Sequence, residues 1–363
     1  MKDSIDRICR YFETQKGKVT LGIDGFVDEV WEVVKVRMSP TSYELYDKMR
    51  DFAKSVLDVG EGGYANEVIR KRRSHGGFTA HTGEAVDNLG VDLTLVGMFG
   101  VDPIDPVYQV FSDTCKVYSV GPTGLCPTLE FADGKILLPY SEEIVNVDWA
   151  QVSAVLSGDE LRAAFGEADI VGIAYWSLLN NFNDLVTNLC ENVVKPGARM
   201  FFDFADIRKR SRQALLDSLA VLAALNHKTP MILSLNEHEA GILFSYYDKQ
   251  FDWKNPESAD RDIEYIRQRA GLDELIVHTP YFAVAATASE GTAVVLQNYC
   301  ENPVITTGAG DNFNGGYVSA SAQRGALSLT ERLLVANAVG YAYVSNGHSP
   351  DRAMLKDALE LYM

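Results

Sequence analysis

The sequence predicts an α/β fold, in which a mostly parallel central sheet is flanked by helices and carries a small β lid. After residue 150, short apolar runs rich in β-forming residues alternate with helical patterns. Such alternation is typical of βαβ units, and strands that are apolar throughout are buried on both faces of a parallel sheet. The first 140 residues are less regular and more polar, which indicates a second, smaller structural unit.

Four apolar runs in the second part of the chain are predicted to be strands of the central sheet: residues 169–175, 200–204, 231–235 and 274–277. The short apolar pair Val304-Ile305 is predicted to be a further strand. Ligands of open parallel sheets bind beyond the carboxyl ends of the strands, where the loops lead into helices. The residues that follow 231–235 and 304–305 are therefore the first candidates for a functional site.

The predicted lid consists of two excursions of the chain, residues 27–75 and 114–139. In the first excursion, residues 27–37 alternate partly like an exposed strand and residues 43–57 have a helical pattern. In the second, Ala132-Asp133-Gly134-Lys135 separates two apolar stretches, as in a tight hairpin. The main domain is then expected to comprise residues 1–26, 76–113 and 140–363.

Composition and charge exclude several classes of protein. With 363 residues and 47% hydrophobic content, the chain can form a large buried core. Its 50 acidic and 33 basic residues give a formal charge of −17, which disfavours a general role in binding nucleic acid or anionic membranes. The start of the chain lacks the apolar core of a signal peptide, and no apolar run approaches the ~20 residues of a membrane span.

The cysteines give no sign of a structural framework. They are five in number, scattered, and never spaced as C-x-x-C. This pattern indicates neither a disulfide network nor a zinc knuckle. We therefore expect a cytoplasmic protein.

The most informative segment is the glycine-rich run from Thr306 to Gly316, which leads into a predicted helix. The first N–H groups of a helix have no internal partner and lie at the positive end of its dipole, so they suit a phosphate oxygen. Asp311 would repel a resting phosphate, but it could take a proton from a hydroxyl group that attacks the phosphate. A purely structural helix cap is the alternative. Gly315 and Gly316 argue against it, because each costs about 1 kcal/mol relative to alanine inside a helix.

The same run resembles the second signature of the ribokinase-like (PfkB) carbohydrate kinases. The resemblance rests on Gly308-Ala309-Gly310-Asp311, followed by Phe313 and Gly315-Gly316. It implies that the backbone around Gly308, Ala309 and Gly310 forms an anion hole for the transferred phosphoryl group. It also implies that Asp311 is the base for the acceptor hydroxyl.

A second element of this family, N-x-x-E, is similar to Asn236-Glu237-His238-Glu239. It implies that Glu239 helps to hold Mg²⁺, largely through water, and that Asn236 lies at the nucleotide phosphates. Mg²⁺ prefers oxygen ligands and retains several waters, which suits one carboxylate and an amide at a strand end. Asn and Glu are also ordinary residues at a helix start, so the tetrapeptide alone is a weak signal.

The resemblance further assigns Thr279 and Asn337 to the nucleotide pocket. Here the chain departs from its relatives, which have glycines after the threonine, whereas this chain has none before Gly291. Pro280 and Tyr281 are expected to alter the loop.

The acceptor site is expected near the start of the chain. Gly76 and Gly77 resemble the glycine pair of the family's first signature, where a sugar lies against the backbone, and His81 occupies a position where asparagine is common. Asp24 and Asp28 follow the apolar start of the first strand and resemble the family's aspartate for sugar hydroxyls. Carboxylates suit such a site because they accept hydrogen bonds from two hydroxyls at once.

Taken together, these features predict ATP-dependent phosphorylation of a hydroxyl group on a sugar or sugar-like polyol, with ATP and Mg²⁺. Two alternatives stay open: a nucleoside or vitamin kinase of the same fold, and a sugar-binding or regulatory protein that no longer transfers phosphate. The expected partner is a small molecule, not nucleic acid or membrane. A homodimer formed through the exposed lid is also expected.

Overall fold

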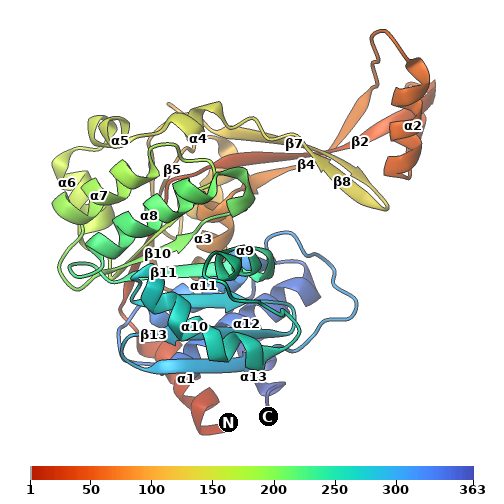
Figure 1. Cartoon of the computed structure of the whole chain (residues 1–363). Coiled ribbons are helices and arrows are strands. Elements are labelled where there is room, and N and C mark those ends of the chain that lie inside the picture. Colours follow the sequence, from red (N-terminus) through yellow and green to blue (C-terminus); the bar gives the residue numbers. More distant parts are fainter. Residues whose placement is uncertain (1) are drawn as a thin grey trace.

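The computed structural model describes residues 2–363, which form a nine-stranded sheet with helices on both faces and a projecting second sheet (Figure 1). Seven neighbouring strands of this sheet are parallel: β6, β5, β1, β9, β10, β11 and β12. At the β12 edge, β13 and β14 continue the sheet as antiparallel strands. In spatial order the strands are β14 (Gly291–Leu296), β13 (Phe282–Thr287), β12 (Glu274–His278), β11 (Met231–Asn236), β10 (Arg199–Asp203), β9 (Ile170–Ala174), β1 (Lys18–Gly22), β5 (Asp92–Gly97) and β6 (Lys116–Ser119).

Two apolar clusters fill the space between the sheet and its helices. Side chains alternate along each strand, so that Met200 and Phe202 of β10 enter one cluster and Phe201 enters the other. On the Phe201 face lie α1 (Lys2–Thr14), α3 (Phe78–Asn88), α11 (Ala309–Ser321), α12 (Leu329–Asn346) and α13 (Arg352–Glu360). On the opposite face lie α4 (Glu142–Asn146), α5 (Trp149–Val155), α6 (Gly158–Leu161), α7 (Phe182–Asn192), α8 (Arg212–Leu225), α9 (Glu237–Tyr246) and α10 (Pro256–Ala270).

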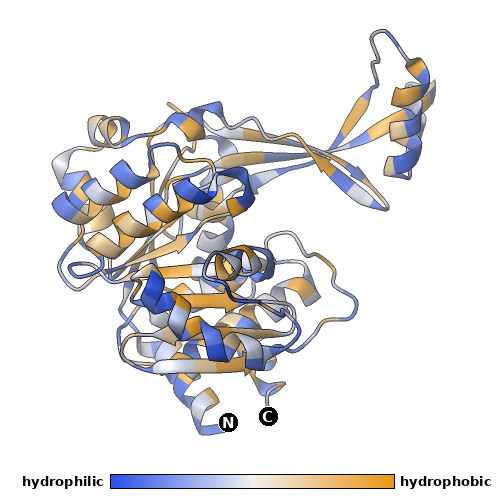
Figure 2. Ribbon diagram, in the orientation of Figure 1, coloured by the Kyte–Doolittle hydropathy of each residue, from blue (hydrophilic) through white to orange (hydrophobic). Residues whose placement is uncertain are grey.

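The second sheet projects from the main body as an arm that ends in helix α2 (Figure 1). Its centre is a long strand, β2, which pairs with β3, β4 and β7, and β8 pairs with β7. Polar and apolar residues are mixed along this arm, whereas the central strands are largely apolar (Figure 2). Its elements are β2 (Phe26–Ser39), β3 (Ser42–Leu45), α2 (Met49–Val59), β4 (Val68–Gly76), β7 (Gly124–Phe131) and β8 (Gly134–Leu137).

The structure differs from the predicted lid boundaries in two places. Residues 114–119 were expected in the lid, but β6 pairs in parallel with β5 in the central sheet, so the second excursion begins at β7. The helical pattern expected over residues 43–57 begins only at Met49, because residues 42–45 form strand β3 against β2. The hairpin expected around Ala132 and Asp133 joins β7 to β8.

The strand predicted at Val304-Ile305 is wrong. These residues lie in an irregular connection, and Val304 is 69% exposed. The chain has already left the sheet at β14, since β13 and β14 form an antiparallel hairpin at its edge. The glycine-rich turn is therefore reached through a loop and not from a central strand. No helix within residues 2–363 combines the length and the apolar character that crossing a membrane requires.

Gly315 and Gly316 are explained by the packing of α11 between two other helices. A Cβ atom on Gly315 would lie 2.6 Å from Cβ of Ala85 on α3, and one on Gly316 would lie 3.0 Å from Cα of Ala336 on α12. The close approach that these glycines permit is thus that of neighbouring helices. It holds the amino end of α11 in place.

We expect Gly315→Ala to lower the free energy of unfolding by about 1–3 kcal/mol, because the added methyl group overpacks the contact with α3. Urea unfolding followed by circular dichroism measures this change. Gly241→Ala in α9 is the matched control, since nothing lies within 4 Å of its added Cβ. The control should gain stability of the order of 0.5–1 kcal/mol from better helix propensity. An unchanged stability for Gly315→Ala would contradict the packing role.

Candidate active site

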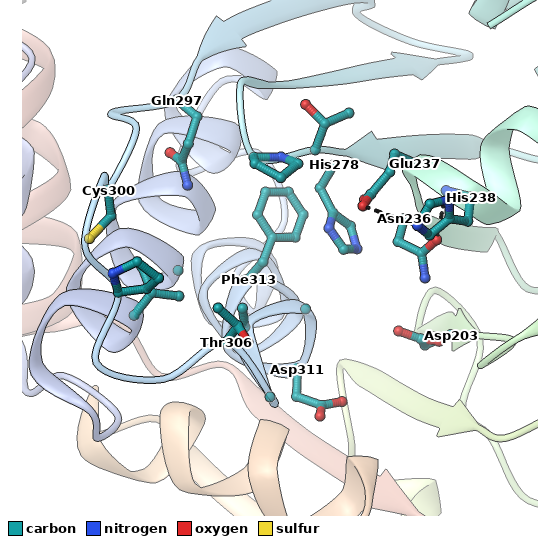
Figure 3. Close-up of a pocket in the computed structure, with 18 of the residues that line it drawn as sticks. Asp203, Asn236, Glu237, His238, His278, Gln297, Cys300, Thr306, Asp311 and Phe313 are labelled. Atoms are coloured by element: carbon teal, nitrogen blue, oxygen red, sulfur yellow. Dashed lines mark hydrogen bonds and ion pairs between the residues drawn. The ribbon is translucent and has the colours of Figure 1, made fainter. Parts of the chain in front are cut away.

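A cavity of about 600 Å³ lies at the carboxyl ends of three neighbouring parallel strands. Asp203, Asn236 and His278 are the last residues of β10, β11 and β12, and all three line it. The amino end of α11 closes the cavity with Gly308, Ala309, Gly310 and Asp311. Figure 3 shows the side chains of Asp203, Asn236 and Asp311 directed toward the same space. The strand ends and the glycine turn therefore form one site.

The first turn of α11 presents unpaired backbone N–H groups. Gly308 is the N-cap and has a left-handed backbone conformation with φ of 86°. Glycine adopts this conformation without strain. Ala309 N–H donates to Thr306 O at 3.2 Å. Within residues 2–363, the N–H groups of Gly308, Gly310 and Asp311 have no acceptor. Three of the turn's amides are thus free to bind an anion, while that of Ala309 is held within the turn.

Asp311 is a half-buried carboxylate at the mouth of this turn. Burial raises the pKa of Asp311 to about 7, with further upward contributions from the charges of Asp203, Asp24 and Asp28, and the charge of His81 opposes them. A carboxyl group with a pKa near the working pH is well suited to accept and release a proton. Helix α3 also fixes this turn, because Thr82 Oγ1 donates to Asp311 O at 3.1 Å.

The raised pKa of Asp311 predicts a pH-dependent reaction. A base must be ionised to accept a proton, so activity is present above the pKa and is lost as the pH falls through it. We expect kcat/KM for the acceptor to rise with pH and to level off above about 7. Initial rates between pH 5 and pH 9 measure this profile. An acid limb centred near the ordinary aspartate pKa of about 4 would contradict the burial of the base.

The predicted acceptor residues lie beside Asp311, on the α3 side of the turn. Asp24 is fully buried and accepts hydrogen bonds from Thr79 N at 2.9 Å and from Thr79 Oγ1. Its Oδ2 atom has no partner among the described residues. Burial raises the pKa of Asp24 to about 6, although the hydrogen bonds from Thr79 oppose this. An unpaired buried oxygen at this place suits a donor from an incoming hydroxyl group.

The glycine pair allows these two carboxylates to approach the backbone. Gly77 has φ of 89°, and a Cβ on it would lie 2.4 Å from Asp24 Oδ2. A Cβ on Gly76 would lie 2.5 Å from the carboxylate of Asp28. Any side chain at either position would therefore displace an aspartate. None of the four residues lines the large cavity itself, whose border on this side is formed by Phe78 and Tyr175.

His81 connects the acceptor residues to the base. Its Nε2 atom lies 3.8 Å from Asp28 Oδ2. Burial alone would lower the pKa of His81, but the interaction with Asp28 and the charges of Asp311 and Glu84 raise it above its usual value. The neighbouring His75, whose ring centroid is 5.7 Å away, behaves differently, since burial and the charge of His81 lower the pKa of His75 to about 4. The surroundings therefore favour the protonated form of His81 and the neutral form of His75.

Glu239 lies behind the cavity wall and not on it. Its carboxylate accepts hydrogen bonds from Asn236 N at 3.1 Å and from Asp206 N at 2.7 Å, while Asn236 Oδ1 accepts from Glu239 N at 3.0 Å. This capping box ties the start of α9 to the loop after β10. Burial and the charge of Asp203 raise the pKa of Glu239 to about 8. Besides Asp311, the acidic residues that line the cavity are Asp203 and Glu237.

The expected contact of Asn337 with a nucleotide does not match its place in the structure. Its side chain is 1% exposed and donates to Val295 O at 3.1 Å on β14, whereas Gly340 and Val344, farther along α12, line the cavity. Thr279 does line the cavity. Its Oγ1 accepts hydrogen bonds from Tyr281 N and Phe282 N, both at 3.0 Å, and thereby holds the turn between β12 and β13.

Several cavity residues are not among the predicted site residues. Asp203 ends β10, with Oδ2 accepting from Asn314 Nδ2 at 2.7 Å. His278 stacks on Phe313 with ring centroids 4.6 Å apart and 27° between the ring planes. The loop from Gln297 to Cys300 forms the far wall. Only the position of Asp203 at the end of an apolar run was a usable signal.

Comparisons with known proteins place this chain in a family. Residues 5–362 match the family described as prokaryotic ketohexokinase. A protein of Haloferax volcanii named ketohexokinase is 28% identical over 340 residues, which cover 92% of this chain and 88% of that protein.

Solved structures show the same fold. Arabidopsis thaliana ribokinase complexed with ribose and ATP has a TM-score of 0.65 at 17% identity and covers 96% of this chain and 99% of its own. Escherichia coli phosphofructokinase-2 in complex with substrates and products has a TM-score of 0.63 at 14% identity and covers 95% and 99%. A nucleoside kinase of Methanocaldococcus jannaschii has a TM-score of 0.61 at 17% identity and covers 96% and 100%. The predicted ribokinase-like fold is confirmed.

Proposed function

Because this chain belongs to the prokaryotic ketohexokinase family and is an ATP-dependent carbohydrate kinase, we propose that its acceptor is a ketohexose. The family description and the name of the Haloferax relative both support this substrate class. The observation that carries the proposal is the placement of Asp311 between unpaired amides on one side and the Asp28–His81 pair on the other. A sugar hydroxyl and a terminal phosphate would meet at that carboxylate.

In this proposal, Asp311 accepts the proton of the sugar hydroxyl as the hydroxyl oxygen bonds to the terminal phosphorus atom of ATP, and the bond from that phosphorus to the bridging oxygen breaks to release ADP. Asp24 and Asp28 accept hydrogen bonds from other hydroxyl groups and orient the sugar. The charge of His81 favours the ionised form of Asp311. The protonated His81 side chain also forms an ion pair with Asp28. Gly76 and Gly77 leave the space in which the two aspartates reach the sugar.

The amino end of α11 would stabilise the phosphoryl group. The N–H groups of Gly308, Gly310 and Asp311 have no other acceptor, and such preorganised donors are most effective where negative charge develops. The Ala309 amide could join them by giving up its bond to Thr306. We assign the rest of the nucleotide to the remainder of the cavity, between Thr279 and the loop after β14.

The residues at the strand ends fit a hydrated Mg²⁺ ion. Asp203 and Glu237 present carboxylates and Asn236 an amide to the cavity, and Mg²⁺ takes few protein oxygens and keeps its waters. Glu239 would not contact the ion directly. It would orient Asn236 through their hydrogen bonds and add negative charge near the ion. When bound, the ion would neutralise charge on the phosphates. Its charge would also favour the ionised form of Glu239, whose pKa burial raises to about 8.

We further propose that two copies associate through the arm. Helix α2 has no buried residue, and a stable protein rarely leaves such a surface uncovered. The exposed apolar side chains of this arm include Val36, Met38, Tyr43, Val56, Leu57 and Val59. All five cysteines are free, which supports a reducing, cytoplasmic environment.

A substrate screen tests the proposed function. Purified protein is supplied with MgATP and with ketohexoses, aldohexoses, pentoses and nucleosides in turn, and ADP release is followed by a coupled assay. We expect a ketohexose such as fructose to have the highest kcat/KM, by about tenfold or more over the matching aldohexose. Preference for a nucleoside or an aldose would refute the substrate class.

A further inference from the structure

A second pocket lies at the opposite end of the central sheet from Asp311. Its volume is about 320 Å³, which falls in the range of small-metabolite sites. It is formed where α1, the start of β10 and the end of α11 meet, and Lys16, Arg199 and Arg324 are among its lining residues. No step of the kinase mechanism uses any of these three cations.

Arg199 is a buried cation without an ion pair of its own. It is 6% exposed, and its Nη2 donates to Ser321 O at the end of α11. Within residues 2–363, no carboxylate oxygen lies within 4.0 Å of its guanidinium group, and Nε has no acceptor. The carboxylate whose charge acts on it most, Glu274, is held by Tyr317 and Arg332. A buried guanidinium group normally requires a closer anion.

The rim of the pocket repeats this excess of positive charge. Lys16 and Arg324 are exposed, and neither has a carboxylate within ion-pair distance among the described residues. Asp169 is the acidic member of the lining, but its oxygens already accept from Lys195 Nζ at 2.6 Å and from Lys18 N at 2.9 Å. In a chain with a formal charge of −17, three uncompensated cations around one cavity are unexpected. The group has the composition of an anion site.

We propose that this pocket binds a small anion that carries a phosphate group. Arg199 supplies a planar fork of donors at the base, and Lys16 and Arg324 supply charge from the rim; guanidinium groups match phosphate oxygens in both geometry and charge. The carbonyl end of α11 would by itself repel an anion. The positive charge of Arg199, whose Nη2 donates to Ser321 O, offsets this repulsion. The site is separate from the anion hole at the other end of α11.

Titration with inorganic phosphate tests this site in the full chain. The anion hole is first filled with MgCl₂ and excess AMP-PNP, and sodium chloride keeps the ionic strength constant. Isothermal calorimetry then measures phosphate binding, and a thermal melt measures stabilisation. We expect one phosphate per chain. Lys16→Ala combined with Arg324→Ala should weaken binding by about tenfold or more, since each removes a charge-assisted contact.

The matched control replaces two exposed cations elsewhere, Lys54 on α2 and Arg269 on α10, and should change phosphate affinity by less than about twofold. Arg199→Met is a third variant, which should abolish the stabilisation by phosphate while the unliganded protein stays folded, because a buried unpaired charge is replaced by an apolar chain. The proposal is overturned if the wild type binds no phosphate under these conditions, or if the rim double variant and the control behave alike. Either result leaves the kinase assignment untouched, since the catalytic assay is independent of this pocket.

Discussion

Replacing Asp311 with asparagine is expected to lower kcat by about 10³–10⁴-fold, the upper part of the range for losing a general base. Asparagine has nearly the same shape, so the turn and its free amides should remain in place, but an amide cannot accept the hydroxyl proton at neutral pH. Because Asp311 is not needed to bind the other hydroxyls, the dissociation constant of the sugar should change little. Initial rates from a coupled ADP assay and calorimetric titration with sugar measure the two quantities.

The control for this variant is Asp248→Asn, the same substitution after helix α9, where residue 248 has a positive φ of 57° that asparagine also tolerates. It should keep the wild-type rate. If Asp311→Asn retained more than about a tenth of the wild-type kcat, the proton would have another acceptor and Asp311 would not be the base.

Replacing His81 with asparagine should impair both the acceptor site and the base. The charge of His81 lowers the pKa of Asp311 in the native protein, so its removal should raise that pKa further, by an amount of the order of one unit. The acid limb of kcat/KM then moves to higher pH, and activity near pH 6.5 falls by about tenfold from this effect alone. Loss of the ion pair with Asp28 should raise KM for the sugar as well. A full pH–rate profile separates the two effects.

His75→Asn is the matched control, because His75 lies beside His81 but burial and the charge of His81 lower the pKa of His75 to about 4. Removing a neutral ring should leave the acid limb in place. The electrostatic role of His81 is refuted if its asparagine variant shows an unshifted acid limb, whatever happens to KM.

The parallel part of the fold could be predicted from the sequence because its strands are continuous apolar runs. The antiparallel edge could not. The turn between β12 and β13 contains Pro280 and Tyr281 but no glycine, so it lacked the usual hairpin signal. Val304 and Ile305 carried a strand-like composition but lie beyond the sheet edge, where the chain has already turned back through β14. Local composition could not show that the sheet had ended.

The candidate site divides in the same way. Residues within the glycine turn, such as Gly308 and Asp311, are placed by local backbone geometry, and a short motif was enough to find them. His278 lines the cavity because β12 lies beside β11, which only the assembled sheet determines. Glu239 was expected at the metal, yet its capping box with Asn236 draws the carboxylate behind the wall. Asn337 was expected at the nucleotide, but its side chain donates a hydrogen bond to Val295 O on β14, a tertiary contact that the sequence does not reveal.

The most direct test of the central claim is a crystal structure with AMP-PNP, Mg²⁺ and a ketohexose. The account predicts that a carboxylate oxygen of Asp311 lies about 2.6–3.2 Å from the acceptor hydroxyl, which is the reach of a general base. It also predicts that the terminal phosphate accepts hydrogen bonds from the amides of Gly310 and Asp311. A sugar bound away from Asp311, or a terminal phosphate that does not contact the start of α11, would contradict it.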